Sequence, residues 1–196
     1  IEELSGMTWE EFVQENILKP LGMDRTTFYV DAIKADPNHA TPYSRVLPTD
    51  LTGYEAIDFL KSDCEDMSKG IGAPYGPAGS IMSTINDMCK WVQFNLDNGK
   101  VDGKQIISEE NMKEVHKANM LMSEPLLLPF PEEDFYSYGM GWFVETYRGH
   151  VMVEHGGNID GFSALVTMIP DMQLGIVCLT NFNNSFNTYA STNDIL

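Results

Sequence analysis

The sequence predicts an α+β fold in which helices come first and an antiparallel sheet follows. Before residue 120 the regular apolar patterns have the period of a helix, whereas from Tyr138 onward they alternate with the period of two typical of strands. With 196 residues, of which 43% are hydrophobic and 21% charged, the chain is long enough to bury a core. We expect one domain, with a helical and loop region over residues 1–137 and a strand meander over 138–181.

The first predicted helix has a start signal of its own. Thr8 is followed three residues later by Glu11, the spacing of a capping box in which each residue bonds the other's backbone N–H. Apolar residues at helical spacing then predict an amphipathic helix over residues 9–18. Pro20 is expected to end it, because proline lacks the N–H that a helix interior needs.

Residues 24–80 carry several prolines and no sustained period, which predicts mostly ordered loop of a functional kind. Residues 50–60 could hold a short strand or a helical turn. The proline-broken segment 119–135 exposes apolar residues, and is either an arm packed on its own core or a lid that faces substrate.

Two further helices are predicted between these loops. Residues 85–96 show one apolar face that includes Ile85, Asp87 lies in the first turn where the helix dipole favours an anion, and Gly99 is suited to the stop. Ser108 can cap a second helix over residues 109–118.

The period of two predicts four antiparallel strands in succession. Two short turns join them at Arg148-Gly149 and after Pro170. The predicted strands are residues 138–147, 150–154, 161–169 and 174–181.

Charge and cysteine content exclude several classes of partner. A net charge of -17 without clusters of lysine or arginine argues against nucleic acid and anionic membranes. No apolar run approaches 18 residues, so no membrane span is expected. Cys64, Cys89 and Cys178 have no zinc-ligand spacing, so no metal is expected. Cys89 and Cys178 lie in apolar runs and are expected in the core. The other histidines, His39, His116 and His150, are expected at the surface.

The stretch from Glu154 to Phe162 lies between two predicted strands and places an ionisable ring beside flexible backbone. His155 is followed by Gly156 and Gly157, and glycine lets a ligand approach the main chain closely. Taken alone, such a cluster is either a turn or bulge, or one side of a site. The rest of the chain favours the second interpretation.

Several separated motifs, taken together, resemble the serine beta-lactamase-like and penicillin-recognising family, which includes class C beta-lactamases, DD-peptidases, D-aminopeptidases and esterases. They follow the family order over most of the chain. The matching segments are residues 6–13, 17–23, 26–28, 77–84, 87–91, 155–157, 161–162, 170 and 179–181.

The resemblance implies a beta-lactamase/transpeptidase-like fold and acyl transfer on an amide or ester, with no cofactor. His155 would take the first position of the third catalytic box, where it would hydrogen-bond substrate or a tyrosine. Gly156 and Gly157 would let substrate lie along the strand as an added strand. The backbone N–H of Asn158 would match one oxyanion donor. The alternative for the Asn158 side chain, and for Asp160, is that it serves only the turn. Tyr75, Pro77, Ala78 and Gly79 either line the pocket or form a plain junction between loop and helix.

The sequence departs from the family in two motifs. No serine is followed by lysine three positions later, and no tyrosine by asparagine two positions later. We therefore expect a C-terminal part of a serine hydrolase, incomplete at both ends and inactive alone, with residues 1–4 as the last turn of a helix and 191–196 as the start of one. The partner would be a small-molecule or peptide substrate. An exposed sheet edge would favour self-association. The alternative is an inactive relative that binds peptide or cell-wall fragments.

Overall fold

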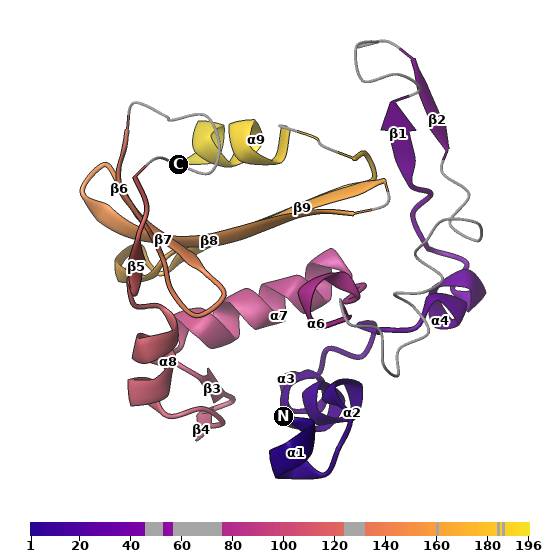
Figure 1. Ribbon diagram of the computed structural model, residues 1–196, viewed down its shortest axis with the longest axis horizontal. Helices are drawn as coiled ribbons and strands as arrows, with labels where there is room; N and C mark the ends of the chain where they lie inside the picture. The colour runs from indigo at the N-terminus through magenta and orange to yellow at the C-terminus, as the bar shows by residue number, and fades with distance from the viewer. Residues whose placement is uncertain (46–52, 57–75, 124–131, 160, 184, 186) are drawn as a thin grey trace. The chain divides into compact units, whose positions relative to one another are not determined.

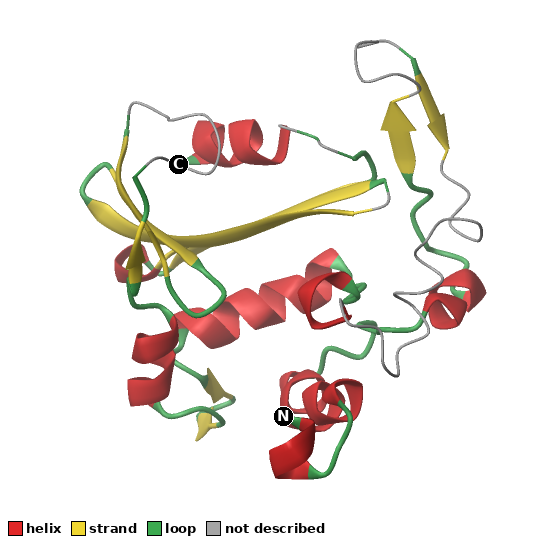
Figure 2. Cartoon of the chain, viewed as in Figure 1, coloured by secondary structure: helices red, strands yellow, loops and turns green. Residues whose placement is uncertain are grey.

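The structure is a computed structural model that describes residues 1–45, 53–56, 76–123, 132–159, 161–183, 185 and 187–196 (Figure 1). The chain divides into two compact units. Unit 1 comprises Ile1–Met88, Gly157–Ala164 and Cys178–Leu196, and unit 2 comprises Cys89–Gly156 and Leu165–Val177. Most helices come early in the chain and most strands late, with one helix at the C-terminus, which confirms the α+β class (Figure 2).

Unit 1 begins with a run of short helical segments whose start the sequence predicted. Thr8 Oγ1 accepts the Glu11 N–H at 3.2 Å, and the Glu11 carboxylate accepts the Thr8 N–H at 3.0 Å, so the capping box is confirmed. The segments are α1 (Glu2–Ser5), α2 (Trp9–Val13), the π-helical η1 (Gln14–Leu18) and α3 (Lys19–Leu21).

The prediction that Pro20 ends this helix is wrong. The helical path continues through α3 and ends at Gly22, whose φ is 64°. The Lys19 N–H bonds the carbonyl of Gln14, five residues back, so the backbone is wider here than in an α-helix. Such widening relieves the clash between a proline ring and the carbonyl four residues before it.

The long stretch predicted as loop contains short regular elements. Two of them, β1 and β2, pair antiparallel with Ser44 opposite Glu55. The C-terminal prediction is also wrong, because residues 191–195 form the second half of a helix that begins at Asn187. The remaining elements of unit 1 are α4 (Val30–Ala35), β1 (Tyr43–Arg45), β2 (Tyr54–Ala56), α6 (Gly76–Gly79) and α9 (Asn187–Ile195).

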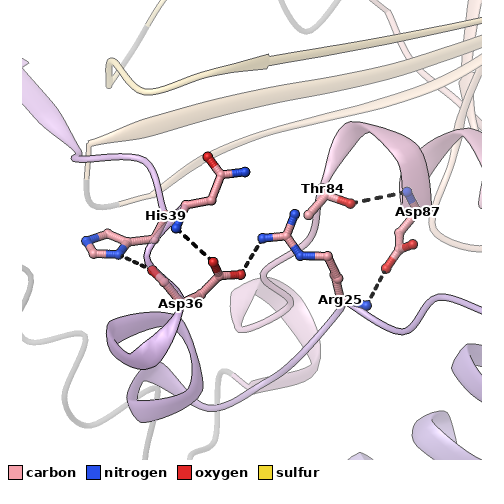
Figure 3. Close-up of polar contacts among 6 residues, drawn as sticks. Arg25, Asp36, His39, Thr84 and Asp87 are labelled. Atoms are coloured by element: carbon pink, nitrogen blue, oxygen red, sulfur yellow. Dashed lines mark hydrogen bonds and ion pairs between the residues drawn. The ribbon is translucent and has the colours of Figure 1, made fainter.

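A buried carboxylate ties the chain after α3 to the start of α7 (Ile85–Leu96). Asp87 Oδ2 accepts the Arg25 backbone N–H at 2.8 Å and the Thr26 hydroxyl at 2.9 Å. The Asp87 N–H reaches Thr84 Oγ1 at 3.3 Å, and the Arg25 guanidinium pairs with Asp36 (Figure 3). Both ends of this connection lie within unit 1, and Asp87 anchors them.

Unit 2 contains most of α7, a small hairpin and α8. The 85–96 helix is confirmed to the residue. Val92 and Leu96 of the helix are buried, as are Phe94 and Asn95, whereas Ile85 is exposed and does not share the buried face. Ser108 caps α8 through the Asn111 N–H at 3.2 Å, although the helix ends three residues before the predicted boundary. The elements are β3 (Lys100–Val101), β4 (Lys104–Gln105) and α8 (Glu109–Val115).

The described residues contain one six-stranded sheet, in the order β10-β9-β8-β7-β6-β5. The predicted single strand over 138–147 is wrong. Gly139 and Gly141 turn the chain between β6 and β7, since Gly141 has φ 79° and a Cβ on Gly139 would lie 2.6 Å from the Lys117 carbonyl. The strands are β5 (Met120–Leu121), β6 (Glu133–Tyr138), β7 (Phe143–Tyr147), β8 (His150–Ile159), β9 (Phe162–Ile169) and β10 (Leu174–Thr180).

Backbone angles and side-chain exposure test the predicted turn and the predicted cysteine positions. The Arg148-Gly149 turn is confirmed by positive φ at both residues. Cys89 is exposed rather than in the core, and Cys178 is half-buried; burial raises the pKa of the Cys178 thiol. Cys64 lies outside the described residues. Met120 and Leu121 are exposed at the β5 edge, and self-association through a sheet edge stays a prediction.

Of the three histidines expected at the surface, His116 is half-buried instead. Its ring packs edge-on against Trp142, and its Nε2 lies 3.0 Å from the Asn95 side-chain oxygen. Burial lowers the pKa of His116. None of the described helices is long and apolar enough to cross a membrane.

Candidate functional site

The stretch singled out in the sequence lies inside a strand rather than between two strands. His155, Gly156, Gly157 and Asn158 all belong to the ten-residue β8. The side chain of His155 is exposed, whereas the preceding Glu154 is 9% exposed. The alternative of a turn at this motif is therefore excluded, and the predicted strand over 150–154 is too short, because β8 continues to Ile159.

Both ring nitrogens of His155 have a neighbour within hydrogen-bond distance. Nδ1 lies 2.7 Å from the carbonyl oxygen of Gly156, and Nε2 lies 3.1 Å from the hydroxyl of Tyr138. The imidazole is thus held by its own strand on one side and by β6 on the other. A histidine with two fixed partners can keep or exchange a proton at a defined atom.

Two aromatic rings from the β6–β7 hairpin surround the imidazole. The Phe143 ring lies 5.2 Å from it at an interplanar angle of 34°, and the Tyr138 ring lies 6.0 Å away nearly edge-on. Tyr138 and Phe143 are register partners across the hairpin, with ring centroids 4.8 Å apart. Backbone pairing therefore places both rings where His155 meets them.

Neither of the two usual structural requirements for glycine applies at Gly157. Its φ is not positive, and a Cβ built on it meets no heavy atom within 4 Å in the described structure. Neither backbone strain nor packing of the described residues demands a residue without a side chain here. Close approach of a substrate to the backbone at Gly157 stays a prediction.

Asn158 makes a local contact through its side chain. It meets the hydroxyl of Ser163, which also lies 2.8 Å from the Phe182 carbonyl and accepts the Ser185 N–H at 3.0 Å. This contact gives the side chain a structural role at the link between β8 and β9. Its backbone N–H as an oxyanion donor stays a prediction.

The structure places the other expected pocket residues only in part. Gly79 is the last residue of α6 in unit 1, and Pro77 and Ala78 in the same helix are exposed. Tyr75 and Asp160 lie outside the described residues. Lining of a pocket by residues 75–79 stays a prediction.

Two buried carboxyl groups belong to β7 and β8, one of them directly before His155 in the sequence. Register pairs Phe143 with Glu154 and Glu145 with Met152, so the two glutamates are diagonal neighbours on one face. Burial, and then the Glu154 carboxylate, raise the pKa of Glu145 to about 8. Burial also raises the pKa of Glu154 to about 7, against the lowering effect of the Thr167 hydroxyl at 2.9 Å.

Sequence reasoning missed Tyr138 and the two glutamates. The signal for Tyr138 was the pair of glycines at 139 and 141. These glycines predict a hairpin in which Tyr138 and Phe143 lie opposite each other. The signal for Glu154 was a charged residue directly after the apolar run 151–153. A carboxylate within a buried strand marks an unusual environment.

Comparison with known proteins agrees with this architecture. The family model described as Beta-lactamase matches residues 1–195. The chain is 27% identical over 194 residues to an unguisins hydrolase of Aspergillus campestris (strain IBT 28561), a match that covers 98% of this chain and 32% of that protein. It is 25% identical over 187 residues to the protein flp of Staphylococcus aureus (strain MW2), with coverage of 95% and 31%.

A solved structure supports the fold. The octameric penicillin-binding protein homologue from Pyrococcus abyssi superposes with a TM-score of 0.72 at 21% identity, over 99% of this chain and 39% of that one. The chain spans about a third of the length of the curated relatives that it matches. The antiparallel sheet with its helices is thus a beta-lactamase/transpeptidase-like fold of the serine hydrolase type. The chain belongs to the beta-lactamase family.

Proposed function

We propose that the chain is part of a serine hydrolase that acts on an amide or ester carbonyl of a small molecule or peptide through an acyl-enzyme. Membership of the beta-lactamase family supports hydrolysis, and the unguisins hydrolase is one such relative. Residues 1–196 contain neither a Ser-x-x-Lys nor a Tyr-x-Asn motif. In this proposal the nucleophile and its base come from sequence outside these residues, and the chain by itself is inactive.

The observation that carries the proposal is the exposed His155 imidazole, fixed by two hydrogen bonds on a strand with an open glycine two residues further on. Acyl transfer needs a group that moves or holds a proton beside the carbonyl. Substrate backbone can lie close to β8 at Gly157, because no side chain stands there. His155 then meets the substrate from the same strand.

The test compares two histidines of β8 in the whole protein. We expect His155→Ala to lower kcat/KM by about 10²-fold, the usual scale for loss of a group that handles a proton. His150→Ala is the matched control, since His150 opens the same strand and pairs with Asp171 at 2.7 Å. Turnover is measured on a beta-lactam, a D-amino acid anilide and a simple ester.

Two results would contradict the proposal. Equal turnover in His155→Ala and His150→Ala would remove His155 from the chemistry. Absence of turnover and of covalent labelling by a fluorescent penicillin in the whole protein, together with retained binding of peptide, would favour the inactive relative that binds cell-wall fragments.

A further inference from the structure

The geometry around His155 fixes which ring nitrogen carries the proton. A carbonyl oxygen can only accept a hydrogen bond, so Nδ1, at 2.7 Å from the Gly156 oxygen, must be the N–H. In the neutral ring Nε2 then has a lone pair. The Tyr138 hydroxyl, 3.1 Å from Nε2, is the donor to it.

The position of Tyr138 is itself firmly determined. Its carbonyl accepts the Asn119 N–H at 3.1 Å from the β5 side, and its strand pairs with Phe143 on the other side. The turn that follows is closed by the Gly139 N–H to the Trp142 carbonyl at 2.8 Å. Trp142 is buried, at 7% exposure. A hydroxyl carried on such a backbone can orient a side chain on the neighbouring strands.

Aromatic packing also restricts rotation of the His155 imidazole. Phe143 lies against the imidazole and Tyr138 lies edge-on to both rings, so rotation of the imidazole would break either a ring contact or a hydrogen bond. Tyr136, two residues earlier on β6, instead bonds the Glu133 carbonyl at 3.2 Å. Of these two tyrosines only Tyr138 reaches His155.

We propose that Tyr138 is a positioning residue for His155, which its hydroxyl holds as the Nδ1–H tautomer with Nε2 as the site of proton exchange. When Nε2 gains a proton, the hydrogen bond reverses and the Nε2–H donates to the phenol oxygen, so the contact survives both states of the ring. The relevance of this positioning to turnover rests on the proposed function. The assignment of the tautomer does not depend on the proposed function.

The test reads the tautomer directly by ¹⁵N NMR of the histidine rings in the whole protein. The wild-type protein should show neutral His155 as Nδ1–H, with its signals identified by their loss in His155→Ala. Tyr138→Phe keeps the ring and removes the hydroxyl, and should raise the ratio of Nε2–H to Nδ1–H by about fivefold, the equivalent of one hydrogen bond. Tyr136→Phe is the matched control and should leave the ratio unchanged.

The outcomes separate the two proposals. A wild-type His155 in the Nε2–H form, or an unchanged ratio in Tyr138→Phe, would overturn the positioning role, and the wild-type measurement decides even if the variant does not fold. If the tautomer shifts as expected while His155→Ala leaves turnover intact, the positioning stands and the proposed function fails. If the positioning role and the proposed function both hold, Tyr138→Phe should lower kcat about tenfold with little change in KM.

Discussion

Asp87 in unit 1 and Glu145 in unit 2 are both buried carboxyl groups, at 3% and 6% exposure, yet their surroundings differ. Asp87 accepts a backbone N–H and a hydroxyl at the first turn of a helix. The carboxyl group of Glu145 has no hydrogen bond or ion pair within the described residues, and Glu154 is its diagonal neighbour. Burial is the same in kind, but only Asp87 has donors.

The difference shows that donors, rather than depth, decide what a buried carboxyl group does. A carboxylate with hydrogen bonds from its surroundings can remain charged in the interior and join distant segments. A carboxyl group without donors keeps its proton, because the charged form loses its hydration and gains nothing. Asp87 thus contributes to the structure of unit 1. For Glu145 we expect instead that the stability of the folded chain depends on pH.

Removal of the Asp87 carboxylate should have the largest effect. Asp87→Ala leaves the Arg25 N–H and the Thr26 hydroxyl without their buried acceptor, and should lower the free energy of unfolding by about 3 kcal/mol. Asp97→Ala, at an exposed position directly after the same helix, is the control and should change the free energy of unfolding by less than about 0.5 kcal/mol. Urea unfolding measures the free energy of unfolding of both variants. Equal losses in the two variants would show that the buried contacts of Asp87 do not stabilise the fold.

Replacement of Glu145 should stabilise the protein at high pH, whereas replacement of Asp87 destabilises it. Its pKa is about 8 in the folded protein against an ordinary 4.5, so between these values the folded state holds a proton that the unfolded state has released. Stability should therefore fall as pH rises through this window. Glu145→Gln keeps the shape without the titration, and should flatten this fall and stabilise the protein at pH 8 by on the order of 3 kcal/mol.

Unfolding measured from pH 5 to pH 8 tests this prediction. Glu110→Gln, on the exposed face of α8, serves as the control and should keep the wild-type slope. A wild-type stability that rises across the window, or a slope that Glu145→Gln leaves unchanged, would mean that Glu145 has a donor in solution.

Thr167 offers the smallest and most specific test, because its hydroxyl is the donor to Glu154. Thr167→Val should raise the pKa of Glu154 further above about 7 and cost about 1 kcal/mol, more at pH 8 than at pH 5. Thr146→Val removes a hydroxyl that bonds the Asp134 carbonyl instead, and should leave the Glu154 pKa in place. Titration of the Glu154 carboxyl by ¹³C NMR distinguishes the two variants.

Features with local causes were predictable from the sequence. The capping box at Thr8, the helix over 85–96 and the Arg148-Gly149 turn each depend on residues within a few positions of one another. The order of the family motifs likewise led to the fold. Local patterns failed where a neighbour far along the chain decides, as at Gly139, which must lack a side chain because of the Lys117 carbonyl.

The candidate site divides in the same way. From the sequence by itself came the beta-lactamase family and the α+β fold, which are confirmed, and the choice of His155 with its glycines as the candidate motif, which stays a prediction. Only the tertiary structure decided that this motif lies within β8, that Tyr138 meets its imidazole, and that two glutamates lose their hydration nearby. Strand register and burial set those relations, and both depend on pairing between segments that no local pattern specifies.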